Sequence, residues 1–372
     1  MASRRQVILG LGGALVAGTA AGTWRVMRQP DNAIAPWQAL SQPVADPRLD
    51  ALRHAILAPN PHNRQPWLIR LDGSDSAVLT CDLAKRLPET DPFDRQITIG
   101  FGTFIELAAI AASQRGYRLE VEPFPEGEPQ PRLDHRPVAR LRWVADPALP
   151  RDPLAAAIAL RRTNRQVYAS LPPGRLAALA EPGVTLSDDA ELLARLARIT
   201  VAAITGEMET PAAHMESVNL MRIGAAEIDA MPDGIALSGP MIEATSLVGL
   251  TTRAALADPA STAYRLGLED LQRTYGSIPA ALWITTPDNS RASQIAAGRA
   301  YARTTLHAAR AGVAVHPLSQ SLQEYPAMAA HFAQVHSLLA PDGGQVQMLA
   351  RAGLAAPVRP AARYPLEAHL LT

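Results

Sequence analysis

A short polar segment, PNPHNRQPW, gathers side chains that could hold a small ligand. It spans residues 59–67 and is enclosed by prolines, which restrict its backbone. Its centre supplies an imidazole, two amides and a guanidinium, from His62, Asn63, Gln65 and Arg64. The apolar residues that follow, WLI, are typical of a buried strand. A rigid polar loop that leads into a buried strand can position a ligand against the protein.

A second segment, ALRRTNRQVY, concentrates positive charge after the apolar stretch PLAAAIAL, which is typical of a helix. On a helix, Arg161, Arg162, Thr163 and Arg165 would lie within one and a half turns. A phosphate would satisfy this crowding, because each charge-assisted hydrogen bond contributes roughly 1.5–3 kcal/mol when shielded from water. The alternative is a solvated run of surface arginines, which most charge runs are.

The composition indicates a globular protein and excludes several classes. The chain has 372 residues, of which 48% are hydrophobic and 19% charged, enough for one large core or two medium ones. Its 35 basic and 35 acidic residues cancel, so no overall field attracts nucleic acid. Cys81 is the only cysteine, which excludes an internal disulfide and any cysteine-built metal site. We expect no metal site and a small buried apolar role for Cys81.

The N-terminal run SRRQVILGLGGALVAGTAAG predicts an export signal of the twin-arginine type. Its five glycines argue against a structural helix, since each costs roughly 1 kcal/mol relative to alanine. It is also shorter and less apolar than the roughly 20 residues that a membrane span needs. Residues 1–35 are therefore assigned to a signal or anchor, which implies the twin-arginine export machinery as a partner. The expected location is the periplasm, with membrane anchoring if the signal is kept.

An internal repeat sets the expected architecture. The runs that begin at Gly102 and Gly298 each reach a second glycine fourteen residues later, through an alanine-rich helical stretch that leads into a strand. Two related halves are what the fusion of a symmetric homodimer would leave. Chance similarity between two alanine-rich helices is the alternative.

The two polar segments together resemble motifs of the nitroreductase family of flavoproteins. RRTNR is similar to the family's Arg-Arg-Ser-x-Arg, and NPHNRQPW to its Pro-Ser-x-x-Asn-x-Gln-Pro-Trp, with matches at Asn63, Gln65, Pro66 and Trp67. Residues 45–372 resemble the double-length branch often called Acg-like, many of whose members carry twin-arginine signals. A departure is that Pro61 and His62 precede Asn63 where the family has its serine.

This resemblance implies a site for flavin mononucleotide (FMN). In the family, the arginine motif of one subunit and the Asn-Gln loop of the other meet at one flavin. Here the two motifs lie in different halves, which implies a monomeric pseudo-dimer with one working pocket. The segment VAVHPLSQSL resembles the part whose backbone N–H groups face flavin N5, and RPAARYPLE the basic segment that returns to the phosphate. The implied FMN-binding residues are His62, Asn63, Gln65, Arg161, Arg162, Thr163, Arg165, Pro317, Leu318, Ser319 and Arg363.

Three of these assignments have alternatives. Ser319 could instead cap a helix, because SQSLQE opens a helix well. Arg359 is a weaker match than Arg363, and terminal arginines are often only surface charges. His62 could donate a proton, but flavin chemistry belongs largely to the cofactor, so no residue is assigned a catalytic role.

The expected fold is α+β, with helices around mixed or antiparallel sheets. The expected division is a first repeat at residues 36–150 and a second at 151–372, with a methionine-rich insertion at 206–260 that could form a lid. The leading function is an FMN-dependent oxidoreductase that passes two electrons from an unknown donor through flavin N5 to a small electron-poor acceptor. The alternative is a flavin-binding or storage protein whose lid occludes the FMN.

Overall fold

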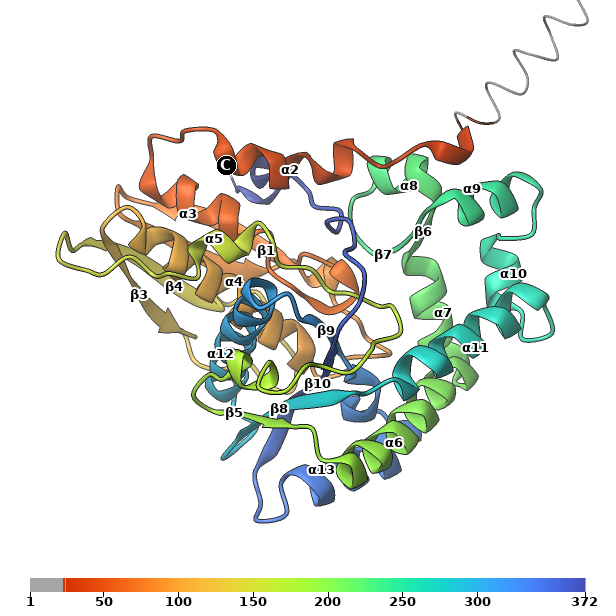
Figure 1. Cartoon of the computed structure of the whole chain (residues 1–372). Coiled ribbons are helices and arrows are strands. Elements are labelled where there is room, and N and C mark those ends of the chain that lie inside the picture. Colours follow the sequence, from red (N-terminus) through yellow and green to blue (C-terminus); the bar gives the residue numbers. More distant parts are fainter. Residues whose placement is uncertain (1–22, 24, 372) are drawn as a thin grey trace, which may run out of the picture.

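The computed structural model describes residue 23 and residues 25–371. The run that predicts the twin-arginine signal, residues 3–22, lies outside these residues. Figure 1 shows two sheets, a pair of long helices between them, and a helical arm on one side.

The first sheet is wholly antiparallel. It contains β1 (Trp67–Asp72), β2 (Ser76–Cys81), β3 (Tyr117–Pro123) and β4 (Ala139–Ala145), in the order β1-β2-β4-β3. Gly73 lies in the turn between β1 and β2 with a φ of 55°, a conformation that glycine adopts readily. β2 is buried along most of its length, so it forms part of the core of this half.

The second sheet repeats the plan of the first. It contains β5 (Val184–Ser187), β8 (Ala280–Thr286), β9 (Ala314–Pro317) and β10 (Gln345–Gly353), in the order β5-β8-β10-β9. In both sheets the first two strands precede a long helix and the last two follow it. All strand pairs of the second sheet are antiparallel, as in the first. The shared strand order of the two sheets is consistent with the expected repeat.

The two long helices cross at the glycines that mark the repeat. α4 (Arg95–Ser113) and α12 (Arg291–Arg310) approach so closely at Gly102 and Gly298 that a Cβ on either would lie 2.9 Å from the Cα of the other. Such a Cβ on Gly102 would also lie 2.2 Å from a backbone oxygen of α12. Only glycine permits this crossing.

A helical arm lies between β5 and β8 and is longer than the sequence indicated. The expected insertion at residues 206–260 covers only its middle, because its first and last helices, α6 and α11, pack against each other and continue into the second core. The arm consists of α6 (Ala190–Glu209), α7 (Pro211–Leu220), β6 (Met221–Ile223), α8 (Gly224–Ala230), β7 (Ile235–Leu237), α9 (Pro240–Leu247), α10 (Arg253–Ala257) and α11 (Thr262–Gly276).

Both ends of the described chain return to the first half. The N-terminal part contributes α2 (Ala35–Gln38) and α3 (Pro47–Ala55), which lie near the C-terminal segment in Figure 1. The C-terminal segment reaches β1, where the Leu371 N–H donates to the Ile69 carbonyl at 2.8 Å. Residues assigned by sequence to the second repeat therefore pack on the first. The remaining helices are α5 (Ala155–Ile158), α13 (Ala329–Leu339) and the short 3-10 helices η1 to η8.

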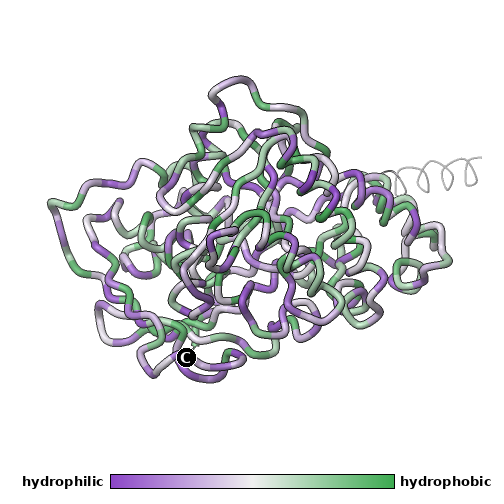
Figure 2. The backbone as a smooth tube through the Cα atoms, turned by 90° about the horizontal axis from the view of Figure 1, so that it is seen from below, coloured by the Kyte–Doolittle hydropathy of each residue, from purple (hydrophilic) through white to green (hydrophobic). Residues whose placement is uncertain are grey.

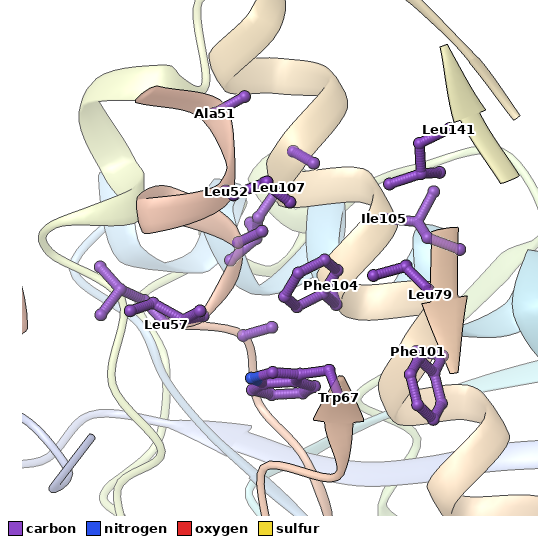
Figure 3. Close-up of a cluster of buried hydrophobic side chains, with 14 of the residues drawn as sticks. Ala51, Leu52, Leu57, Trp67, Leu79, Phe101, Phe104, Ile105, Leu107 and Leu141 are labelled. Atoms are coloured by element: carbon purple, nitrogen blue, oxygen red, sulfur yellow. The ribbon is translucent and has the colours of Figure 1, made fainter. Parts of the chain in front are cut away.

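The largest core fills the first half (Figure 3). The rings of Trp67 and Phe104 have centroids 5.0 Å apart, and Cys81 is buried in the same cluster, as expected. Among the described residues, α4 is the one helix long and apolar enough to cross a membrane, but 89% of that stretch is buried in the fold. Figure 2 shows hydrophobic and hydrophilic residues interleaved along the backbone.

Candidate functional site

Two arginines that are far apart in sequence meet beyond the C-terminal end of α3. Arg161 donates from Nη2 to the Leu57 carbonyl at 3.2 Å. Arg363 donates from Nη2 to the carbonyls of Leu57 at 3.1 Å and Ala58 at 2.9 Å, and from Nε to that of Ile56 at 2.9 Å. Carbonyl groups at a helix C-terminus carry partial negative charge, so this is a favourable place for guanidinium groups.

A tryptophan lies against two of the guanidinium groups. The Arg162 guanidinium carbon lies 4.5 Å from the Trp37 ring centroid, and that of Arg363 lies 5.7 Å from it. Trp37 is only 7% exposed, and its indole N–H donates to the Ala361 carbonyl at 2.8 Å. We call Arg161, Arg162 and Arg363 the arginine cluster.

No carboxylate neutralises the arginine cluster. Within the part of the chain that the structure describes, none of its members has an Asp or Glu oxygen within 4.0 Å. Burial, with some repulsion from Arg162, lowers the pKa of Arg161 to about 10. Burial and the neighbouring guanidinium groups also hold the pKa of Arg363 well below its usual value. Buried positive charge without a partner is costly, so a bound anion would stabilise this arrangement.

Several donors in the segment RRTNR remain available for an anion. In the described residues, Arg161 uses one of its five N–H groups, and Arg162 donates only from Nη1, to two backbone carbonyls. The side chains of Thr163 and Arg165 have no hydrogen-bond partner there. Arg363 differs, because all five of its N–H groups have acceptors within the protein. In this structure it acts as a tether.

The expectation that the arginine motif lies on a helix is wrong. α5 ends at Ile158, and Thr163 instead forms a parallel bridge with Val315 of β9. The Asn164 N–H donates to the Val315 carbonyl at 3.2 Å, which satisfies a group on this edge strand. The extended path separates Arg165 from the cluster. Arg165 is exposed and lies close enough to His62 and His316 to lower the pKa of each, although burial is the larger cause.

The loop 60–65 holds an unusual backbone conformation. His62, Asn63 and Gln65 have φ angles of 46°, 52° and 52°, which cost roughly 1–2 kcal/mol each for residues with a side chain. Asn60 fixes the loop, because its side-chain oxygen accepts from the Gln65 N–H at 2.8 Å. Strain of this kind persists only where surrounding contacts hold it, and it concentrates at functional sites.

The two amide side chains of this loop are engaged within the protein. The Asn63 side chain donates to the Ala362 carbonyl at 3.0 Å and accepts from Arg363 at 2.5 Å. The Gln65 side chain donates to the Pro232 carbonyl at 2.7 Å and accepts from the Tyr364 N–H at 3.0 Å. Both amides therefore join the loop to the C-terminal segment and to the helical arm.

His62 retains an unsatisfied polar atom. Its Nδ1 is buried and has no hydrogen-bond partner among the described residues. Burial, followed by repulsion from Arg165 and Arg64, lowers the pKa of His62 to about 4, so its ring is neutral at pH 7. A neutral imidazole can either donate or accept one hydrogen bond at this nitrogen. This unsatisfied nitrogen, with the unpaired Arg165 close enough to act on the same ring, marks a place where a ligand could bind.

The segment after β9 supplies one free backbone donor. Pro317 has no N–H, and the Leu318 N–H is used within the sheet, where it donates to the Leu349 carbonyl at 2.8 Å. The Ser319 N–H has no partner in the described chain. Ser319 opens η6 (Ser319–Leu322), whose cap position is Leu318 without a side-chain cap, so the expected capping role of Ser319 is not seen.

Residues of the helical arm complete the surroundings of this segment, and sequence reasoning missed them. Glu207 on α6 is buried and accepts from the Gln323 amide at 2.6 Å. Burial raises the pKa of Glu207 to about 7. Tyr275, at the end of α11, packs edge-on against His316 with ring centroids 5.4 Å apart. No motif marks either residue, because only the fold brings them to β9.

The helical arm contacts the loop 60–65 through the turn MPDG, residues 231–234. Asp233 accepts from Arg64 at 2.9 Å, Lys85 at 2.6 Å and Arg222 at 2.7 Å. Gly234 donates from its N–H to the Asn63 carbonyl at 3.3 Å, with a φ of 77°. The arm is thus tied to the candidate site by buried ion pairs.

Other features of the surface lie away from this site. One hollow of about 360 Å³ lies beside α4 and β3, and another of about 620 Å³ lies between α6 and α13. Neither is lined by the arginine cluster or the loop 60–65. Across residues 25–371, no group of three His, Cys, Asp or Glu side chains is placed to hold a metal ion.

Comparisons with known proteins relate the chain to nitroreductases. No protein-family model matches it. Two curated proteins of Mycobacterium tuberculosis, from strains CDC 1551 / Oshkosh and H37Rv, are each named "Putative NAD(P)H nitroreductase". Each is 27% identical over 320 residues, which cover 84% of this chain and 86% of the relative. The chain is a distant relative of these nitroreductases.

Solved structures of nitroreductases match about half of the chain. The FMN-dependent nitroreductase of Mycobacterium smegmatis, crystallised with NADPH, is 18% identical, with a TM-score of 0.31, over 54% of this chain and 89% of its own. A nitroreductase-like protein of Bacillus cereus is 12% identical, with a TM-score of 0.32, over 59% of this chain and 96% of its own.

Proposed function

We propose that this protein is an FMN-binding oxidoreductase of the nitroreductase type. The single observation that carries the proposal is the arginine cluster, in which Arg161 and Arg363 are buried and Arg162 is half-buried, and which has no carboxylate partner in the described chain and lies beside a strained loop with an orphaned imidazole nitrogen. Such a site suits a phosphorylated ligand with a polar ring. The resemblance of RRTNR and NPHNRQPW to the motifs of flavin-binding nitroreductases supports FMN as that ligand.

The chain's own residues would divide the work of binding. Arg161, Arg162 and Thr163 would hold the phosphate, because they keep unused donors. His62 and the Ser319 N–H would meet polar atoms of the ring, while Arg165 would add positive charge near it. Three other side chains would not touch the ligand but would hold the loop 60–65 in its strained conformation, namely Asn63, Gln65 and Arg363. Bound flavin would supply two-electron transfer through N5 to a small electron-poor acceptor.

We further propose that the chain is a fused pseudo-dimer with one such site and works as a monomer. The matching strand orders and the crossing at Gly102 and Gly298 support this. The arginine motif and the Asn-Gln loop come from different halves and meet, since Arg161 and Arg363 converge while Arg363 bonds to Asn63.

The location and electron donor are part of the same proposal. The paired arginines of the leader favour export by the twin-arginine route, to the periplasm or to a membrane-anchored state. NAD(P)H, which appears in the relatives' names, is cytoplasmic, so an exported enzyme would need another reductant.

The second candidate function is flavin storage behind a closed lid. The contacts that favour it are those of Pro232, Asp233 and Gly234, which join the helical arm to the loop 60–65. While they hold, a substrate would have no path along this side of the site. The two functions share the same flavin site and differ only in turnover.

One purification tests both. The full chain, with its leader, is purified fresh, and its absorption spectrum is recorded before and after FMN is added. Flavin absorbance that is quenched or shifted on binding supports the site, whereas a colourless protein that refuses FMN contradicts it. Dithionite-reduced protein is then mixed with a nitroaromatic or a quinone. Reoxidation faster than that of free FMN indicates an oxidoreductase, and slower reoxidation indicates storage.

A further inference from the structure

Residues 31–41, which include α2, lie across the arginine cluster as a strap. The Ala33 carbonyl accepts from the backbone N–H of Arg363 at 2.8 Å. The backbone N–H of Ala33 donates to the Asp229 carboxylate of α8 at 3.0 Å. Asp31 pairs with Arg359 at 2.6 Å. The strap is therefore tied both to the C-terminal segment and to the helical arm.

Trp37 is the part of the strap that meets the cluster. Its ring lies near the guanidinium groups of Arg162 and Arg363, and it is buried although it belongs to a helix of only four residues. A guanidinium stacked on an aromatic face loses its freedom to rotate, but its edge donors remain free. Arg162 fits this description, because its Nε and Nη2 have no partner in the described residues.

We propose that Trp37 is a positioning residue for the phosphate of the ligand, and that the strap 31–41 completes the phosphate site. This rests on the proposed function. No carboxylate fixes Arg162, so the Trp37 indole and two backbone carbonyls together hold its guanidinium in place. An arginine already held in place binds an anion more tightly, because less side-chain freedom is lost on binding.

The same contacts connect the strap to the lid. Ala33, Ala362 and Ile228 form a small buried cluster that joins the strap, the C-terminal segment and α8. The strap therefore contacts both the arginine cluster and the helical arm, and the arm in turn contacts the loop 60–65. Loss of Trp37 should loosen both.

The test compares two flavins that differ only in the phosphate. Dissociation constants of FMN and riboflavin are measured by flavin fluorescence for the full chain and for Trp37→Leu and Trp37→Phe. Trp37→Leu keeps an apolar side chain without an aromatic face, whereas Trp37→Phe keeps a weaker one. We expect Trp37→Leu to weaken FMN about tenfold, which corresponds to about 1.4 kcal/mol, and riboflavin less than twofold. Trp37→Phe should fall between it and the wild type.

Trp143→Leu is the control, because it removes a buried indole from β4 that has no hydrogen bond or cation–π contact with the arginine cluster among the described residues. It should leave the ratio of the two constants unchanged. Equal weakening of both flavins by Trp37→Leu, no change, or tighter FMN binding would each overturn the proposal. A wild-type protein that binds neither flavin would instead contradict the proposed function itself, which separates the two failures.

Discussion

Arg161 and Arg363 donate hydrogen bonds to one and the same oxygen, the carbonyl of Leu57. The first follows α5 and the second lies near the end of the described chain, yet both reach the last turn beyond α3. Two guanidinium groups share an acceptor in this way only if other interactions offset their repulsion. The partial negative charge of the helix end is one, and a bound anion would be another.

Replacing a phosphate arginine should weaken FMN much more than riboflavin. Arg162→Gln removes a charged donor group with free N–H groups, so FMN affinity should fall by about 2 kcal/mol, or roughly 30-fold. Fluorescence titration with both flavins measures this. Arg273→Gln is the control, because Arg273 is exposed and its one ion-pair partner in the described chain is Asp270 of its own helix. Similar losses for both variants would contradict a specific phosphate role.

The glycine crossing should be highly sensitive to a single methyl group. Gly298→Ala would place a Cβ 2.0 Å from the Ile99 carbonyl oxygen, so the helices must separate. We expect a loss of at least about 2 kcal/mol in the free energy of unfolding. Gly267→Ala, on α11, meets nothing within 4 Å and should gain up to about 1 kcal/mol from helix propensity. Urea denaturation measures both, and equal effects would refute the close crossing.

Asp233 should hold the helical arm closed. Burial alone would raise the pKa of its carboxyl, but hydrogen bonds from Lys85 and Arg222 hold it below its usual value. Its stabilising contribution is therefore present above the unfolded pKa near 3.9 and is lost as the pH falls through the folded pKa. Asp233→Asn should cost about 3 kcal/mol, because Arg64 and Arg222 lose a buried partner.

Release of bound FMN provides the measurement for this arm. With Asp233→Asn at pH 7, the FMN off-rate should rise severalfold, because the turn no longer grips the loop 60–65. Asp270→Asn, at an exposed ion pair, should leave it unchanged. An off-rate that does not respond to Asp233→Asn would show that the arm does not retain the ligand.

Glu207 should make the protein less stable as the pH rises. Burial raises its pKa to about 7, whereas the unfolded value is near 4.5. The folded state therefore binds the proton more tightly. Ionising the buried Glu207 carboxyl therefore lowers the free energy of unfolding. This loss is absent below about pH 4.5, grows by roughly 1.4 kcal/mol per pH unit between pH 4.5 and 7, and is complete above pH 7. Glu207→Gln should flatten this part of the stability profile.

Urea unfolding at pH 5, 6, 7 and 8 checks this prediction. Glu209→Gln serves as the control, since Glu209 lies on the same helix but is exposed. It should retain the wild-type profile. A wild-type profile already flat above pH 5 would indicate that Glu207 titrates normally and is not buried as described.

Much of the site was visible in the sequence because motifs are local. The loop around His62 and the charge at Arg161 and Arg162 are continuous segments whose types and spacing point to a small ligand and an anion, and the family resemblance adds the flavin ring. The glycines Gly102 and Gly298 were recognised as part of a repeat, but the close helix crossing at them came only from the structure. The repeat suggested two related halves, and the two antiparallel sheets with the same strand order are consistent with it.

The rest depended on the fold. The sequence could not show that the side chains of Asn63 and Gln65 form their hydrogen bonds within the protein. Their partners lie far along the chain, at Ala362, Pro232 and Tyr364. The sequence also placed Arg165 on a helix, although pairing of Thr163 with β9 extends that segment. Helix propensity is a weak guide where an edge strand offers unpaired backbone groups.

The ion pairs between α4 and α12 show what joining two halves in one polypeptide permits. Glu106 of α4 pairs with Arg299 and Arg303 of α12, but Ala302 stands at the matching position of α12. Two identical subunits could not hold such a one-sided contact. Covalent linkage also keeps the shared surface together at any dilution. On the proposed origin by fusion, each half could lose what the other kept, and neither half could now be replaced by a second copy of the other.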